Sequence, residues 1–218
     1  MRAAALLLPL LVLSACKEPS IDPLTAGPEA PEDAPVSATT GGAEYAIARI
    51  LPLGESSISG TVSFTQQADG VLVEYDLAGL ELGEHGFHVH EGDDCGPGDD
   101  GAPGGAAGGH FDPYGAPHGG PDGDREMRHV GDLGNVTSVA AGARTGGVAR
   151  GEILDQLISL SGPTSVVGRA MMVHRSADDL ESQPSGAAGD RFGCGIIGLA
   201  TPPAPDMAPS PESDVVAP

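Results

Sequence analysis

The sequence predicts an all-β protein, an antiparallel sandwich or barrel between residues 44 and 200, and three observations support this fold class. Short segments that alternate in polarity or are rich in β-branched residues recur along the chain with turn signals between them. No stretch shows a long apolar repeat of 3.6 residues, so helix content should be low. The two ends are rich in Pro, Ala, Glu and Ser and have little that could form a core.

Eight segments are predicted to be strands. A hairpin is expected between the second and the third, because Ala68-Asp69-Gly70 ends in glycine, which adopts positive φ at low cost. The chain has no Trp and only 3% aromatic residues, so the core must be built from Val, Ile, Leu and Ala. The predicted strands span residues 45–53, 57–67, 70–77, 85–91, 134–140, 151–155, 169–174 and 195–199.

Two long insertions rich in Gly and Pro interrupt the succession of strands, one at about 92–129 and one at about 175–193. Loops of this length in a compact domain are usually either functional or disordered. Histidines concentrate in the first insertion and at the edges of both, which favours a functional interpretation.

The N-terminus predicts export. Arg2 precedes an apolar run that ends at Leu13, which is typical of a signal peptide. The alternative, a transmembrane span, needs about 20 apolar residues. The segment Leu13-Ser14-Ala15-Cys16 resembles the lipobox of bacterial lipoproteins, so we expect acylation of Cys16, where each buried CH₂ adds about 0.8 kcal/mol of membrane affinity. The residue after Cys16 is Lys17, whereas an Asp at this position would resemble an inner-membrane retention signal.

The predicted organisation has four parts: a signal peptide at 1–15, a lipidated cysteine and disordered tether at 16–43, one domain at 44–200 and a disordered Pro-rich tail at 201–218. The expected location is the periplasmic or cell-surface side of a bacterial outer membrane. Cleavage would remove one of 10 Lys and Arg and none of 31 Asp and Glu. Such an acidic chain does not bind nucleic acid by charge.

Three cysteines are an odd number for an exported chain. If Cys16 is lipidated, Cys95 and Cys194 remain as a pair, and an oxidising compartment favours one disulfide. The alternative is two free buried thiols.

The seven histidines include two clusters that could bind metal. His88 and His90 flank one residue of a predicted strand, so both rings face the same side, although two half-exposed strand histidines would give the same pattern. The first insertion has too few apolar residues to fold alone, and a metal would organise it. Its three imidazoles and one carboxylate suit tetrahedral zinc, the alternative being a flexible loop with incidental histidines. This set comprises His110, His118, His129 and Asp132.

Six segments, in order and across about 44–200, resemble the copper/zinc superoxide dismutases. This resemblance implies an eight-stranded Greek-key sandwich or flattened barrel with two long functional loops. The segments are Gly86-Phe87-His88-Val89-His90-Glu91, His110-Phe111-Asp112-Pro113, His118-Gly119-Gly120-Pro121, Arg128-His129-Val130-Gly131-Asp132-Leu133-Gly134-Asn135-Val136, Val173-His174 and Gly193-Cys194-Gly195.

The resemblance also implies roles for individual residues. It places copper on four histidines and zinc on three histidines and an aspartate, with His110 bridging the metals. Asp178 matches a carboxylate that orients one ligand of each metal, and Arg191 an arginine at the mouth of the copper channel; a solvated acid and a surface arginine are the alternatives. Cys95 and Cys194 match the family's disulfide. The copper ligands are His88, His90, His110 and His174, and the zinc ligands are His110, His118, His129 and Asp132.

The function implied is disproportionation of superoxide to dioxygen and hydrogen peroxide by Cu(II)/Cu(I) cycling, with Arg191 and His110 as catalytic residues. The second insertion has no lysine, so attraction of the anion rests on Arg191, helped by Arg175 or Arg125, and turnover should depend on salt. A non-catalytic copper- and zinc-binding lipoprotein for storage or delivery is the alternative. A homodimer is compatible with the family. His85 matches no ligand and is expected to be an ordinary polar residue ahead of its strand.

Overall fold

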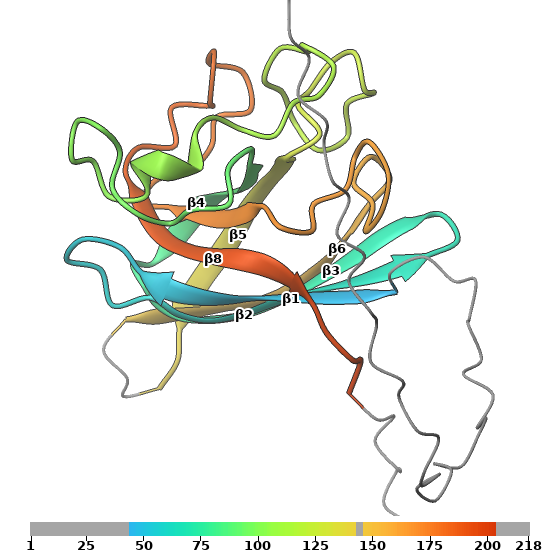
Figure 1. The fold of residues 1–218 in the computed structure, drawn as a ribbon. Helices are drawn as coiled ribbons and strands as arrows, with labels where there is room; N and C mark the ends of the chain where they lie inside the picture. The colour runs from blue at the N-terminus through green and yellow to red at the C-terminus, as the bar shows by residue number, and fades with distance from the viewer. Residues whose placement is uncertain (1–43, 143–145, 204–218) are drawn as a thin grey trace, which may run out of the picture. The chain divides into compact units, whose positions relative to one another are not determined.

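The computed structural model describes residues 44–142 and 146–203, and its strands close into a barrel in the order β1-β2-β3-β6-β5-β4-β7-β8 (Figure 1). Neighbouring strands are antiparallel, and the order β3-β6-β5-β4 is a Greek key. The predicted eight-stranded all-β fold is confirmed. The strands are β1 (Tyr45–Pro52), β2 (Ser59–Gln67), β3 (Gly70–Leu80), β4 (Gly83–His90), β5 (Asp132–Ala140), β6 (Gly147–Asp155), β7 (Ala170–His174) and β8 (Arg191–Leu199).

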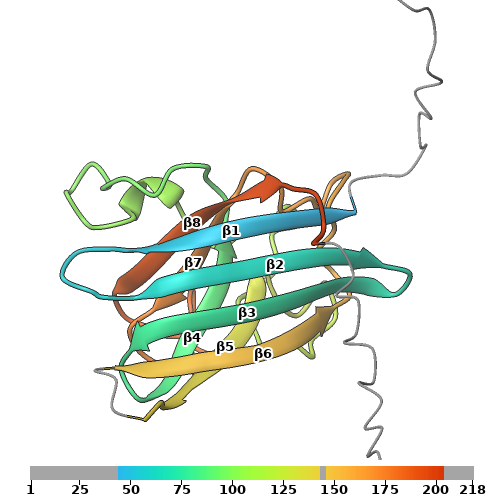
Figure 2. The ribbon, with the colours of Figure 1, turned by 90° about the horizontal axis from the view of Figure 1, so that it is seen from below.

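The barrel is flattened into two layers around the core. Seen from below, β8, β1, β2, β3 and β6 lie side by side, with β7, β4 and β5 behind them (Figure 2). The alternation along β2 turns Val62 and Phe64 inward, where both are fully buried, while Thr61 is exposed. On β4, Phe87 and Val89 are fully buried from the other layer. The two layers therefore bury apolar side chains between them.

The predicted hairpin between β2 and β3 is confirmed. Gln67 is the register partner of Gly70, so Ala68 and Asp69 form a two-residue connection. Gly70 has φ +153°, and a Cβ there would lie 2.3 Å from the backbone oxygen of Asp155. Both the backbone angle and the close approach of β6 therefore require glycine at this position.

Four strands begin earlier than predicted, and one of them is β5, which starts at Asp132 instead of residue 134. β6 starts at Gly147 and β8 at Arg191, because backbone pairing with β3 and with β7 extends into Gly-containing stretches that have no polarity pattern. β4 starts at Gly83, so the placement of His85 ahead of the strand is wrong. The His85 side chain is 1% exposed, and its ring nitrogens lie 2.8 and 2.9 Å from the backbone oxygens of His174 and Glu81.

Both long loops lie on the same side of the barrel (Figure 1). The first connects β4 to β5 and contains one 3₁₀ turn, Gly105–Ala107; the second connects β7 to β8. The predicted disulfide is confirmed: Cys95 in the first loop is bonded to Cys194 in β8, with 5.8 Å between their Cα atoms. This bond ties the first loop to the strand that begins with Arg191, and it joins residues that are 99 positions apart in the sequence.

Several predicted segments lie outside the described residues. They are the signal peptide, Cys16 and the tether up to residue 43, and the tail beyond residue 203. Within 44–142 and 146–203, no helix has both the length and the apolar character that a membrane crossing requires.

Candidate metal centre

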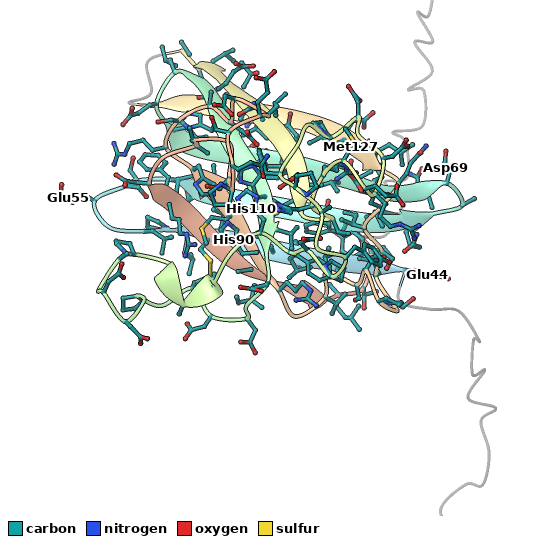
Figure 3. The ribbon with its side chains drawn as sticks, turned by 90° about the horizontal axis from the view of Figure 1, so that it is seen from above. Glu44, Glu55, Asp69, His90, His110 and Met127 are labelled. Carbon is teal, nitrogen blue, oxygen red and sulfur yellow. A yellow bond between two sulfur atoms is a disulfide. The ribbon has the colours of Figure 1, made fainter. Side chains whose placement is uncertain are left out.

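The first group of ligand-type side chains consists of four histidines whose nearest ring nitrogens lie within 4.8 Å of one another. His88 and His90 project from the same face of β4, and His174 ends the neighbouring strand β7. His110 arrives from the first loop, where its backbone forms an isolated bridge with that of His90. Figure 3 shows His90 and His110 close together beneath the loops. The structure thus brings together the four residues that the resemblance assigns to copper.

The second group shares His110 and adds His118, His129 and Asp132, again with ligand atoms within 4.8 Å. Asp132 Oδ1 lies 2.7 Å from His110 Nδ1 and 3.3 Å from His129 Nδ1. His118 Nδ1 lies 3.1 Å from Asp132 Oδ2. Three imidazoles therefore surround one carboxylate, and these four side chains are the ones that the resemblance assigns to zinc.

The ring orientations leave one nitrogen of each copper-group histidine free to face the others. His90 Nδ1 lies 3.0 Å from the Gly108 carbonyl, and His174 Nδ1 lies 3.1 Å from the Gly189 carbonyl. These bonds turn the two Nε2 atoms to within 3.4 Å of each other. A hydrogen bond from one ring nitrogen to a backbone carbonyl or carboxylate is the usual way in which proteins orient a metal-binding histidine.

Buried nitrogens without partners test whether the residues fit metals. Within the described ranges, the nitrogens His88 Nδ1 and His110 Nε2 are buried and have no hydrogen-bond partner, and His118 Nδ1 is buried 3.1 Å from Asp132 Oδ2 without a hydrogen bond of good geometry. Buried polar atoms of this kind are rare in folded proteins because each loses its hydration. All three belong to the two groups, and a metal ion would satisfy each. Four imidazoles suit copper, and three imidazoles with a carboxylate suit zinc.

Asp178 lies between the two groups. Its Oδ2 is 2.7 Å from His88 Nε2 and its Oδ1 is 3.0 Å from His118 Nε2, so one carboxylate contacts a histidine of each group. The Asn135 side chain pairs with the Asp178 backbone in both directions, at 2.8 Å each. The asparagine therefore holds the second loop against β5 at the point where Asp178 reaches the histidines.

A cavity of about 530 Å³ opens beside the copper group, and Arg191 lies on its wall with His90, His110 and His174. The guanidinium is held by the carbonyls of Gly104 and Gly108. Two carboxylates, those of Glu91 and Asp112, also line the cavity. An anion in this cavity would therefore meet one arginine within an otherwise acidic rim.

The two other arginines considered for anion attraction are paired with acids. Arg175 Nη1 lies 2.7 Å from Glu81 Oε1, and Arg125 Nη2 lies 3.3 Å from Glu126 Oε1. Neither is among the residues that line the cavity beside the copper group. Arg191 is thus the arginine placed to contact an anion there.

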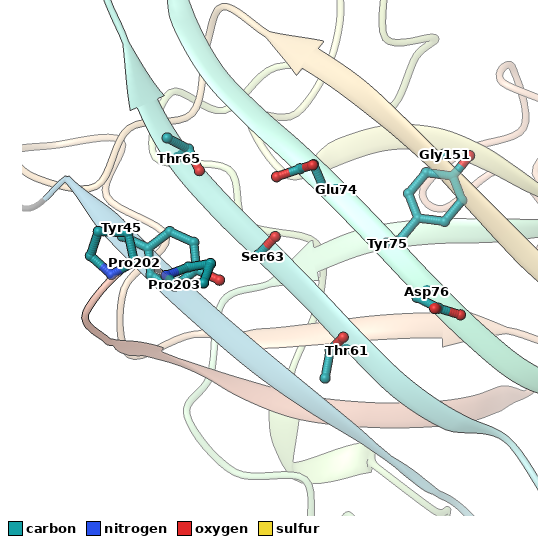
Figure 4. A pocket seen from close by; sticks show the side chains of 10 residues that line it. All are labelled: Tyr45, Thr61, Ser63, Thr65, Glu74, Tyr75, Asp76, Gly151, Pro202 and Pro203. Atoms are coloured by element: carbon teal, nitrogen blue, oxygen red, sulfur yellow. The ribbon is translucent and has the colours of Figure 1, made fainter. Parts of the chain in front are cut away.

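A second hollow lies on the outer face of β1, β2 and β3, away from the histidines (Figure 4). Its lining includes Tyr45, Thr61, Ser63 and Glu74. None of its lining residues is a histidine or a cysteine, so it is separate from both histidine groups.

Arg128 is a structural residue of the site that was not predicted from the sequence. Its side chain is 2% exposed, donates to the Asp132 carbonyl at 2.9 Å and pairs with Asp155 Oδ2 at 2.5 Å. It therefore holds the backbone of a predicted zinc ligand against the barrel. An arginine beside a predicted ligand was the available signal, but its partner lies 27 residues away.

Burial and pairing shift the site's pKa values in opposite directions. Burial lowers the pKa of His110 to about 4 and that of His174 to about 3, because imidazolium loses its hydration. Burial also acts on His118, but the negative carboxylates of Asp132 and Asp178 beside its ring outweigh it and raise its pKa to about 9. Pairing with His110, His118 and His129 holds the pKa of Asp132 well below its usual range against the effect of burial. Pairing with His118 and His88 does the same for the pKa of Asp178.

We expect the metal-free protein to be most stable between about pH 6 and 7. As pH falls below about 6.5, unfolded His110 and His174 take up protons that the folded state excludes, so stability falls toward pH 4. As pH rises from about 6.5 through 9, the stabilisation from protonated His118 is lost. The urea midpoint measured from pH 4 to 9 checks this; a midpoint that rises steadily to pH 9 would contradict the His118 contribution.

Comparison with known proteins identifies the family of this chain. Residues 58–197 match the family described as copper/zinc superoxide dismutase (SODC). The Superoxide dismutase [Cu-Zn] of Candida glabrata is 43% identical over 155 residues, covering 67% of this chain and 93% of that protein. The protein of the same name from Paramecium bursaria Chlorella virus 1 is 41% identical over 153 residues, covering 67% and 75%. The crystal structure of the clock protein EA4 superposes with a TM-score of 0.62 at 39% identity, covering 73% of this chain and 97% of that one. The chain belongs to the copper/zinc superoxide dismutase family.

Proposed function

We propose that this superoxide dismutase works with copper in the first histidine group and zinc in the second. The single observation that carries this assignment is His110, whose ring belongs to both groups. Its Nδ1 faces Asp132, and its buried Nε2 has no hydrogen-bond partner. Copper would be held by His88, His90, His110 and His174, and zinc by His110, His118, His129 and Asp132.

The reaction converts two superoxide anions and two protons to one dioxygen and one hydrogen peroxide. Bound copper supplies the one-electron chemistry, and bound zinc, which has no redox chemistry, fixes the geometry. Arg191 attracts the anion into the cavity and orients it by charge-assisted hydrogen bonds. His110 lines the same cavity, and its Nε2 can hold a proton for the peroxide product whenever it is not a ligand.

Metal analysis combined with pulse radiolysis tests this function. The loaded protein is expected to hold one copper and one zinc per chain and to consume superoxide in a second-order process. A protein that held both metals but left superoxide to its spontaneous decay would be a storage or delivery protein, and the proposed activity would be wrong.

Replacing Arg191 with alanine is expected to lower the second-order rate constant by about tenfold to 100-fold at low ionic strength. The arginine supplies positive charge on the cavity wall, where Glu91 and Asp112 repel the substrate. Arg150→Ala is the matched control, because Arg150 is 64% exposed on β6 and pairs with Asp76. Equal rates for Arg191→Ala and the parent would exclude the proposed role.

We also propose that Cys16 carries a lipid that anchors the domain through the tether of residues 17–43, on the outside of a bacterial membrane. The support is the apolar run ending in Leu13-Ser14-Ala15-Cys16. Cys16→Ser is expected to move the protein from the membrane to the soluble fraction and to remove the acyl mass. A parent protein without that mass would contradict the anchor. A homodimer is the proposed assembly, and sedimentation of the loaded protein tests it.

A further inference from the structure

The side chain of Gln183, in the second loop, pairs with the backbone of His118, in the first. The His118 N–H donates to Gln183 Oε1 at 2.8 Å, and Gln183 Nε2 donates to the His118 carbonyl at 2.9 Å. The amide thus satisfies both backbone groups of one residue, as a neighbouring strand would do. The two residues are 65 positions apart, so this contact joins the two long loops directly.

The same loop also contacts the His118 ring. Asp178 Oδ1 lies 3.0 Å from His118 Nε2, which leaves Nδ1 facing Asp132. The second loop therefore fixes this predicted zinc ligand at two points, the ring through Asp178 and the backbone through Gln183. With both points fixed, neither the position of the residue nor the direction of its Nδ1 can change independently.

The turn that carries Gln183 is organised by its own hydrogen bonds. Asp179 Oδ1 accepts from the backbone of Ser182 at 2.8 Å, and the Gly186 carbonyl accepts from the Asp179 N–H at 2.8 Å. Gly186 has φ +66°, and a Cβ there would lie 1.7 Å from Asp178 Oδ1. The turn consequently packs directly onto the carboxylate that contacts both metal groups, and it presents the Gln183 amide from a fixed backbone.

The two residues after Gln183 lie on the cavity wall. Pro184 and Ser185 line the cavity that also contains Arg191, His90 and His174. Holding Gln183 against His118 therefore also holds this part of the cavity rim, because the rim follows it directly in sequence.

We propose that Gln183 is a positioning residue, a latch that holds His118 for zinc and keeps the Pro184–Ser185 rim in place. This inference rests on the proposed zinc site. The latch acts through the His118 backbone and touches neither substrate nor metal. Its loss should therefore leave the fold intact while zinc binding becomes looser and less regular in geometry.

The test uses the full chain loaded with copper and with Co(II) in place of zinc, since the visible bands of Co(II) report ligand geometry. We expect Q183A to release cobalt to a chelator about tenfold faster than the parent, as the loss of two hydrogen bonds predicts, and to show shifted cobalt bands. Q183E keeps an acceptor for the His118 N–H but places a carboxylate oxygen against the His118 carbonyl. It should therefore release cobalt at least as fast as Q183A.

Q66A is the matched control. The Gln66 amide also makes two-way backbone contacts, accepting from Leu160 N at 3.1 Å and donating to the Gly70 carbonyl at 2.9 Å, but it lies on β2. Q66A should release cobalt within twofold of the parent rate. Q183A with the parent's release rate and spectrum would overturn the latch alone. A parent that bound no cobalt would overturn the zinc site and the latch with it.

Discussion

Replacing His110 with alanine is expected to abolish superoxide turnover and to weaken both metal sites at once. Its ring belongs to both ligand groups, with Nδ1 toward Asp132 and the buried Nε2 without a partner. Removing a residue that merely orients a ligand costs about 10- to 100-fold in metal affinity or activity, and removing a shared ligand should cost more. Copper and zinc content after dialysis and the rate of superoxide decay are the measurements.

His118→Ala is the comparison that isolates the sharing. His118 belongs only to the second group, so this variant should lose zinc and keep copper. If His110→Ala retained one equivalent of each metal, His110 would not be the shared ligand. If both variants lost only zinc, His110 would belong to the second group alone.

Replacing Asp155 with alanine is expected to lower the free energy of unfolding by about 3–5 kcal/mol, because it leaves a buried arginine without its counter-charge. The side chains of Arg128 and Asp155 are 2% and 1% exposed. Asp155 Oδ1 also accepts from the backbone of Leu157 and Ile158 at 2.8 and 2.9 Å. Urea denaturation of the metal-free protein measures the loss without a contribution from the metals.

Asp76→Ala provides the exposed counterpart. Asp76 pairs with Arg150 at 2.9 Å, but the two side chains are 58% and 64% exposed, so its loss should change the unfolding free energy by less than about 1 kcal/mol. An Asp155→Ala variant as stable as Asp76→Ala would show that Arg128 finds water when its partner is removed. Arg128 would then not be the buried support of Asp132 described above.

The strands could be predicted where one face is buried and the other is not. β2 is such a strand, since Val62 and Phe64 alternate with Thr61 and Ser63, and its predicted end at Gln67 agrees with the structure. The starts of β6 and β8 could not be found this way. Their first residues include glycines, and their pairing is decided by neighbouring strands rather than by their own polarity.

The site was partly predictable for a similar reason. A spacing of two residues places His88 and His90 on one face, and that follows from strand geometry alone. The approach of His110 from a loop has no local signal, and the resemblance to a family supplied it. The roles of Arg128 and Gln183 could not be predicted from the sequence, because each acts through a partner far along the chain, at Asp155 and His118. Contacts of that kind have no periodicity from which to predict them.

The closed order of the strands has a consequence for how this protein can exist at high local density. In the closed barrel every described strand has a neighbour on both sides, although β5 and β6 pair only at Val139 with Val148 and Ala140 with Gly147, so no strand offers a whole free edge for another chain to extend. Domains held at high concentration meet one another constantly, and unpaired strand edges are where such encounters become aggregates. Barrel closure would keep crowded copies of this domain from joining through strand addition.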